Sequence, residues 1–180
     1  MIKNTLLFLL LTTVVSLYSQ EWNQANASKV TFKIKNFGVN VDGDFNDIKI
    51  ETNFNSNTLS KSYINAIIKV KSISTGIESR DEHILEEDYF DERTHKTITL
   101  KSKKILKSKN EDFVLFADLT IKGKTKRIEV PLEVLETEST IKIKSNFTIN
   151  RKDFNVGGGS FILSKTVKVQ VEYSGNKQIE

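Results

Sequence analysis

Residues 113–134 decide the fold, and they read FVLFADLTIKGKTKRIEVPLEV. Apolar side chains recur at every second position on both sides of Gly123, a period typical of strands with one apolar and one polar face. A glycine between two such runs predicts a tight hairpin turn. The stretch therefore predicts two antiparallel strands that share an apolar face, made by Phe113, Leu115, Ala117, Leu119, Ile121, Ile128, Val130, Leu132 and Val134.

The same alternation returns along most of the chain. It raises the number of such runs to about eight, and the others lie in residues 30–34, 48–54, 64–70, 97–105, 141–149 and 167–173. When a sheet closes on itself, every strand can bury its dry face and the exposed edges disappear. We therefore expect an all-β fold, an eight-stranded antiparallel β-barrel.

A long connection interrupts this rhythm at residues 75–91, TGIESRDEHILEEDYFD. Hairpin loops normally have about two to five residues, so a connection of this length does more than reverse the chain. Ser79 and Glu82 have the spacing of a capping box, which starts a helix. The segment predicts one helical connection over about residues 76–90, which closes one end of the barrel.

The N-terminus has a different pattern. Lys3 precedes an apolar run over residues 6–15 and the small Ser19 follows it, an order typical of a secretory signal peptide. The run is shorter than the roughly 20 residues of a membrane-spanning helix, and a retained anchor is the alternative. We expect a signal peptide over residues 1–19 and one mature domain over residues 20–180.

The composition excludes several classes of function. The chain has 180 residues, a formal net charge of +4 and no cysteine, so disulfides, thiolate metal sites and cysteine nucleophiles are excluded. Its lysines alternate with apolar residues, as in residues 141–144, which is typical of the wet face of a sheet. The aromatic residues lie mainly on the apolar phase, whereas a nucleic-acid surface needs aromatic and basic residues on one face. We expect no nucleic-acid partner.

No segment has the spacing of a catalytic or metal site. A Gly-x-Ser-x-Gly elbow is absent, and the histidines His83 and His95 do not form a His-Glu-x-x-His motif. Carboxylates that acid–base catalysis would need inside the barrel fall on the polar phase instead, at Glu51, Asp118, Glu129 and Glu133. We expect a protein that is not an enzyme, with no catalytic residue, no metal and no cofactor.

Charged residues gather at two places beside strand ends. Arg80, Asp81 and His83 lie in the helical connection, and Arg151 and Asp153 follow the run that ends at residue 149. One interpretation is that ion pairs, capping and hydrogen bonds from these residues brace the rim of the barrel. The alternatives are that Arg80 and Asp81 form a catalytic pair, or that one of the arginines contacts an anionic headgroup.

The apolar phase is rich in phenylalanine. An eight-stranded barrel has the size at which side chains just fill the interior or one small ligand fits. A tail of roughly fifteen carbons gains up to about 12 kcal/mol from burial, before binding costs of similar order. We expect an apolar tunnel for a long ligand, with a filled barrel as the alternative. Its expected lining is Phe32, Ile34, Phe37, Ile68, Val70, Phe90, Leu100, Leu115, Leu119, Phe147, Ile149, Phe154 and Phe161.

Five short motifs in order resemble those of the YceI-like family of exported bacterial proteins. They are FxIxxFGVxVxGxF at 32–45, VxSIxTG at 70–76, RDxH with FD within 80–91, LTIKGxTK at 119–126 and FxINRxDF at 147–154. The resemblance implies a lipocalin-like antiparallel β-barrel in the periplasm. It also implies a polyisoprenoid chain, such as an isoprenoid quinone, in an internal tunnel, and no assigned enzymatic activity. Dimers occur in this family.

The chain departs from the family pattern at three places. His95-Lys96 stands where Tyr-Pro is usual, Leu100 stands where an aromatic residue is common, and Asn155 replaces the glycine that usually follows Asp-Phe. These positions belong to the expected mouth and lining of the barrel. They therefore concern the identity and length of the ligand more than the fold.

Together these observations predict a periplasmic binding or carrier protein of a Gram-negative bacterium. It would hold a polyisoprenoid or a similar long apolar lipid of the isoprenoid quinone type. A homodimer and a transient contact with a membrane are compatible with such a carrier. The alternative is a non-carrier envelope interaction domain with a filled barrel and a stress-related role. A third hypothesis is a hydrolase or lipid-modifying enzyme.

Overall fold

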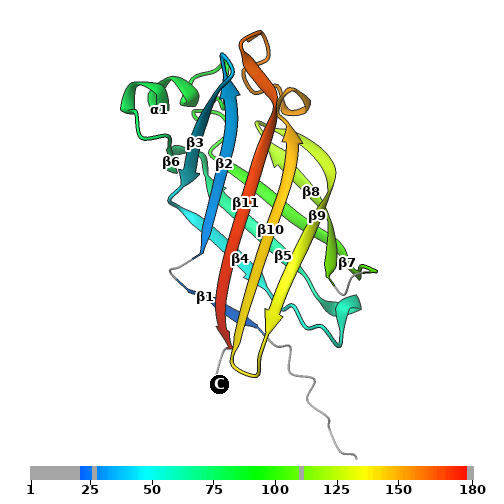
Figure 1. The fold of residues 1–180 in the computed structure, drawn as a ribbon. Helices are drawn as coiled ribbons and strands as arrows, with labels where there is room; N and C mark the ends of the chain where they lie inside the picture. The colour runs from blue at the N-terminus through cyan, green and yellow to red at the C-terminus, as the bar shows by residue number, and fades with distance from the viewer. Residues whose placement is uncertain (1–20, 26–27, 110–111, 178–180) are drawn as a thin grey trace, which may run out of the picture.

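Antiparallel strands build almost the whole molecule (Figure 1). The computed structural model describes residues 21–25, 28–109 and 112–177. The expected signal peptide lies outside these ranges. The strands are β1 (Trp22–Gln24), β2 (Lys29–Asn36), β3 (Val39–Phe45), β4 (Ile48–Thr52), β5 (Ile64–Lys69), β6 (Ile73–Ser74), β7 (Thr97–Lys107), β8 (Phe113–Ile121), β9 (Lys124–Glu136), β10 (Thr140–Asn150) and β11 (Leu163–Lys177).

The strands form one curled sheet. Their order is β4-β5-β7-β8-β9-β10-β11-β2-β3-β6, and β1 pairs with β11 outside this path. Residues 46–47 join β3 directly to β4, so the sheet wraps round an apolar interior. The all-β, antiparallel, barrel-like fold is thus confirmed, with one α-helix in the described part of the chain.

The described part of the chain contains β1, β3 and β6 in addition to the eight expected strands. β1 and β6 are too short to show a period. In β3 the inward position opposite Phe32 is occupied by Gly43, which breaks the apolar alternation. An added Cβ at Gly43 would clash with the Phe32 ring, so the missing side chain makes room for that ring.

The hairpin predicted from residues 113–134 is present as β8 and β9. Its two loop residues, Lys122 and Gly123, have φ angles of 47° and 68°, as a type I′ turn requires. The inward side chains of β8 are all buried, and the apolar side chains of β9 face them across the ladder. The period-two pattern therefore identified both the strands and the side of the sheet that is dry.

The helical connection contains α1 (Glu78–Leu85), which is shorter than the expected range. The expected capping box is wrong, because Ser79 lies inside the first turn and Ile77 occupies the N-cap without a side-chain hydrogen bond. Instead, the Asp81 carboxylate accepts hydrogen bonds from the Thr75 backbone N–H, at 2.9 Å, and from its hydroxyl. Arg80 donates to the Thr75 hydroxyl and carbonyl, each at 2.7 Å. These side chains fix the entry to the helix.

One end of the barrel is closed by β1. The Trp22 indole N–H donates to the Phe54 carbonyl at 2.9 Å, and the Tyr173 hydroxyl donates to the Trp22 carbonyl at 3.3 Å. The side-chain amide of Gln24 also ties β1 to β4, because it donates to the Ile48 carbonyl and accepts from the Ile50 N–H. We call this the closed end.

A seam runs between β9 and β10. The two strands pair only from Ile141 opposite Glu136 to Lys144 opposite Glu133, and then they separate. Pro131 lies just beyond this point and has no N–H to continue a ladder. The 3₁₀ helix η3 (Arg151–Phe154) occupies the widened seam and buries Phe154 against the core.

Among the described residues, no helix is both long and apolar enough to cross a membrane.

Candidate functional site

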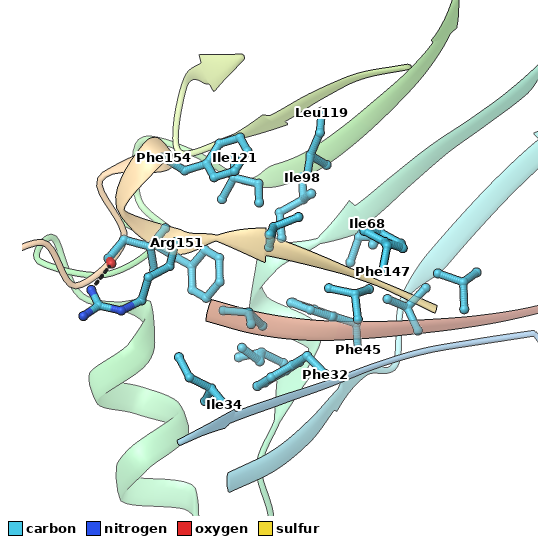
Figure 2. Close-up of a pocket in the computed structure, with 18 of the residues that line it drawn as sticks. Phe32, Ile34, Phe45, Ile68, Ile98, Leu119, Ile121, Phe147, Arg151 and Phe154 are labelled. Atoms are coloured by element: carbon cyan, nitrogen blue, oxygen red, sulfur yellow. Dashed lines mark hydrogen bonds between the residues drawn. The ribbon is translucent and has the colours of Figure 1, made fainter. Parts of the chain in front are cut away.

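The barrel contains an apolar cavity of about 320 Å³, whose lining runs from the mouth to Tyr173 at the closed end. This volume lies at the lower end of the range for small-molecule sites, about 300–1,000 Å³. Side chains from both walls of the sheet line it, with Phe32 and Phe147 on one wall and Ile68 and Ile98 on the other (Figure 2). Helix α1 and residues 151–163 complete the lining near the mouth.

Burial along three adjacent strands shows where the interior becomes hollow. On β10, Ile141 and Ile143 are buried, whereas Phe147 and Ile149 are half-buried although they face inward. β11 and β2 change in the same direction, from buried Tyr173 and Val30 to half-buried residues nearer the mouth. The half-buried residues form two layers across the ladders, which are Phe147, Val169 and Phe32 and then Ile149, Val167 and Ile34.

The opposite wall is more tightly packed. Ile68, Ile98 and Leu119 line the cavity and are buried, and they belong to a core cluster that continues to the mouth. The Phe45 ring contacts both β2 and the helical connection. Its centroid lies 5.7 Å from that of Phe32 and 6.4 Å from that of Phe90. One wall is therefore solid core, and the other presents half-exposed apolar side chains to the cavity.

Most residues of the expected tunnel do lie along this cavity. These are Phe32, Ile34, Ile68, Phe90, Leu100, Leu115, Leu119, Phe147, Ile149 and Phe154. Sequence reasoning missed other lining residues, and for several of them the signal was present in the apolar phase of the strands. The main ones are Val41, Phe45, Ile98, Ile121, Val167, Val169 and Val171.

Three expected lining residues lie elsewhere, and these assignments are corrected. Phe37 is 74% exposed in the β2–β3 turn, where its φ of 50° shows that the strand has ended. Phe161 is fully exposed in the loop before β11. Val70 is 1% exposed but begins a 3₁₀ turn after β5 and packs into the core beside the cavity. For Val70 the alternation extends one residue past the end of β5, whereas Phe37 and Phe161 are phenylalanines that lie outside the strands.

Arg151 is 3% exposed, and it organises the loop that follows η3. Its guanidinium has five N–H donors, and five backbone carbonyls accept them. The acceptors are Ser164 (2.9 Å), Val156 (2.7 Å), Gly157, Ser160 (3.1 Å) and Leu163 (2.7 Å). Burial lowers the pKa of Arg151, but arginine remains charged in proteins. No donor is left for a headgroup, so the bracing interpretation holds for this residue.

Three segments join at the mouth to form what we call the cap: residues 86–95, the β8–β9 turn and residues 151–160. Lys122 connects all three, since its ammonium donates to the carbonyls of Glu87, at 2.5 Å, and Asn155, at 3.2 Å. The Gly157 N–H donates to the Asp88 carbonyl at 2.8 Å. The cap is thus held mainly by hydrogen bonds to backbone carbonyls.

Two departures from the family pattern are explained inside the cap. The His95 ring lies over Gly123, where an added Cβ would be 2.9 Å from the ring. Asn155 has a φ of 57°, a left-handed conformation that asparagine adopts more easily than most residues other than glycine. The third departure, Leu100, lines the cavity. An aromatic ring at this position would occupy part of the space.

Polar groups are few along the lining. Arg80 and His83 reach it from α1, while Asp81 and Asp153 do not. The His83 Nδ1 lies 2.9 Å from the Glu86 carboxylate and its ring packs against Tyr89, so it is tied into the helix end. The described residues contain no group of three or more histidine, cysteine, aspartate or glutamate side chains placed to hold a metal ion.

Comparison with known proteins connects this geometry to a family. Residues 23–174 match the profile described as the YceI-like domain. A curated relative from Vibrio vulnificus, described only as a UPF0312 protein, is 28% identical over 110 residues. The match covers 61% of this chain and 58% of that relative's length. A UPF0312 protein from Pectobacterium carotovorum is 24% identical over 99% of this chain and its own whole length.

Solved structures agree with the fold. BcnA from Burkholderia cenocepacia superposes with a TM-score of 0.78 at 25% identity, covering 82% of this chain and 95% of that one. A polyisoprenoid binding domain from Saccharophagus degradans superposes with a TM-score of 0.69 at 16% identity, covering 89% and 99%. Because the identity is low, this second likeness supports the fold alone. Because the profile spans nearly all of the described residues and the fold superposes on these structures, the chain belongs to the YceI-like family.

Proposed function

We propose that this protein binds one long apolar lipid, a polyisoprenoid or an isoprenoid quinone, in the cavity between the closed end and the cap. The observation that carries the proposal is the pair of half-buried apolar layers on β2, β10 and β11. Inward side chains of a filled barrel would be covered by the opposite wall. Here Phe32 and Phe147 face space instead.

The energetics favour a chain of carbon and hydrogen. Burial of apolar surface contributes about 25 cal/mol per Å², and each methylene contributes about 0.8 kcal/mol. A headgroup would find few partners inside, because the lining is almost entirely apolar and the donors of Arg151 are all used. The similar fold of the Saccharophagus degradans polyisoprenoid binding domain supports the choice of ligand class.

We further propose that the protein is an exported, periplasmic carrier without enzymatic activity. The sequence pattern of residues 1–19 supports export. The lack of polar anchors in the cavity supports a carrier, because a ligand held by apolar contacts alone can leave through the mouth once the cap opens. The lining offers the apolar chain no nucleophile with an adjacent base.

The direct test is native mass spectrometry of the protein purified from the periplasm of its own cells, followed by organic extraction and identification of the lipid. One prenyl lipid per chain is the expected result. A protein that arrives empty and takes up neither added farnesol nor a short-chain quinone would contradict the proposal. That result would favour a filled interaction domain instead.

A pair of neighbouring substitutions locates the site. Phe147→Asp places a carboxylate in the cavity, whereas Thr148→Asp places the same group on the outer, exposed face of the same strand. We expect Phe147→Asp to reduce lipid occupancy at least tenfold while circular dichroism still shows a folded sheet. Thr148→Asp should retain wild-type occupancy. Equal occupancy in the two folded variants would rule out this cavity as the binding site.

A further inference from the structure

The end of the molecule with the cap also carries a cluster of exposed apolar side chains. Phe37, Val39, Phe161 and Ile162 are all exposed, and Phe161 is fully so. The first two lie in the β2–β3 turn and the others in the loop before β11. Figure 1 shows this turn and loop at the same end of the sheet. We call these four residues the apolar tip.

The two halves of the tip are held together by the backbone. The Phe37 N–H donates to the Ile162 carbonyl at 3.0 Å, and Asn36 pairs with Leu163 in the ladder. Leu163 and Ile162 also line the cavity, as does Ile34 two residues before Asn36. The tip is therefore continuous with the mouth, and a ligand that passes between tip and cavity stays on apolar side chains.

Charge around the tip is asymmetric. Lys35, Lys165 and Lys168 are exposed on β2 and β11 below it, and no ion pair is found for them among the described residues. The neighbouring Lys33 pairs with Asp42 at 3.0 Å. The acidic residues of α1, Glu78 and Glu82, lie on the other side of the mouth. Anionic lipid headgroups attract lysines, so this arrangement would direct the lysine side of the mouth to a negatively charged bilayer.

The size of the tip favours a bilayer over a protein partner. Its four side chains expose roughly 500 Å². A stable protein interface buries about 800 Å² on each partner and needs a complementary surface. A bilayer requires neither, because two protruding phenylalanines flanked by lysines can enter the headgroup region directly.

We propose that the apolar tip inserts into an anionic bilayer and places the cavity mouth against the membrane surface. This inference rests on the proposed lipid-binding function and adds the place at which the lipid enters. The lysines of β2 and β11 attract the headgroups, and Phe37 and Phe161 supply the insertion. The cap then faces the lipid that the cavity takes up.

The first test is flotation with vesicles of three parts phosphatidylethanolamine to one part phosphatidylglycerol. The double variant Phe37→Ser with Phe161→Ser should bind these vesicles at least tenfold more weakly than wild type. Leu135→Ser is the matched control, because Leu135 is 72% exposed in β9 near the closed end. It should bind like wild type. Equal binding by all three proteins would overturn the proposal.

A second test examines the lysines separately. Lys35→Glu with Lys165→Glu should weaken binding to these vesicles by at least about fivefold for each lysine, and high salt should also weaken wild-type binding. Lys142→Glu on β10 is the matched control, since Lys142 is exposed and lies near the hairpin of the closed end. A change of the same size in this control would contradict a role for the tip.

Tryptophan reporters show which end inserts. Phe161→Trp should shift its emission to the blue when these vesicles are added, whereas Leu135→Trp should not. Native Trp22 is buried at the closed end and provides a constant background. Equal shifts at both positions, or no shift at either, would overturn the proposal. A third result would also overturn the proposal: wild type forms a dimer in sedimentation velocity and does not bind vesicles, and the tip variant is a monomer. The tip would then bind a second copy of the chain.

The two proposals can fail independently. Uptake of farnesol delivered from cyclodextrin needs no bilayer, so it measures the cavity alone. A tip variant that takes up farnesol like wild type but does not float with vesicles supports the inference. Wild-type protein that takes up farnesol but never binds vesicles overturns the inference and leaves the lipid-binding function intact. Wild-type protein that takes up no farnesol contradicts the lipid-binding function itself.

Discussion

At the closed end, Trp22, Phe54 and Tyr173 pack as buried aromatic rings around a short strand. At the mouth, the cap is held by Arg151 and Lys122, whose donors reach backbone carbonyls of residues 86–95, of residues 151–160 and of the start of β11. Apolar packing is non-directional and is lost only when the core opens. The hydrogen bonds of the cap can break locally while the sheet remains paired. The difference indicates that access to the cavity is through the cap.

The largest expected effect is at the closed end. Phe54→Ala removes a ring that is 0% exposed and packs edge-on against Phe113 at 5.0 Å. We expect the free energy of unfolding to fall by about 3–5 kcal/mol. Urea denaturation followed by Trp22 fluorescence measures it. Phe161→Ala removes an equally large but fully exposed ring and is the control, with an expected change below about 0.5 kcal/mol.

The next effect separates the two ends. Arg151→Met leaves five carbonyls of the cap without their donor, and we expect a loss of about 3 kcal/mol. Hydrogen exchange should accelerate in residues 151–163 far more than in β1 and in the closed-end half of β11. Uniform acceleration through the sheet would mean that the cap and the closed end unfold as one unit. The contrast between them would then be lost.

The smallest effect concerns Tyr173 at the closed end. Burial raises the pKa of Tyr173 to about 12, above the value near 10 of a free tyrosine. The unfolded chain therefore releases this proton first, and stability falls as the pH rises from about 10 to about 12. Tyr173→Phe should cost about 1 kcal/mol at pH 7, through the lost hydrogen bond to Trp22.

The same variant should lose less further stability than wild type between about pH 10 and pH 12, because it has no phenol to ionise. Urea denaturation at both pH values measures the difference. Parallel losses in the two proteins would show that Tyr173 is not the group responsible. The loss of stability at alkaline pH would then have another cause.

The eight longer strands outside β3 were predictable because each carries an alternation that a one-sided sheet satisfies, as in β8 and β10. The cavity was partly predictable for the same reason, since the inward phase of a strand lines whatever lies inside. What the alternation cannot show is how far the opposite wall approaches. Phe147 and Ile143 have the same phase on β10, yet only Phe147 is left half-buried.

Turns and polar contacts were harder to predict. Phe37 and Phe161 are of a residue type common in cores, but Phe37 lies in the β2–β3 turn and Phe161 in the loop before β11, where the strand alternation does not apply. Arg151 invited an interpretation as a headgroup ligand. Its five acceptors are backbone carbonyls, which have no sequence signature. The capping box at Ser79 failed because local spacing was outweighed by the bonds of Asp81 and Arg80 to Thr75.

The pairing of β2 with β11 also determines the order in which the molecule can fold. β7 to β11 form a meander of neighbours that can assemble as the chain is made, with short loops to close. β1 and β2 have to wait for β11, because Val30 pairs with Val171 and Trp22 pairs with Lys177. Pairing of β11 with β1 and β2 is therefore the last step in completing the barrel. Until β11 is available, β1 has no partner and β2 is paired only with β3, so one edge of β2 stays open to chaperones or to aggregation.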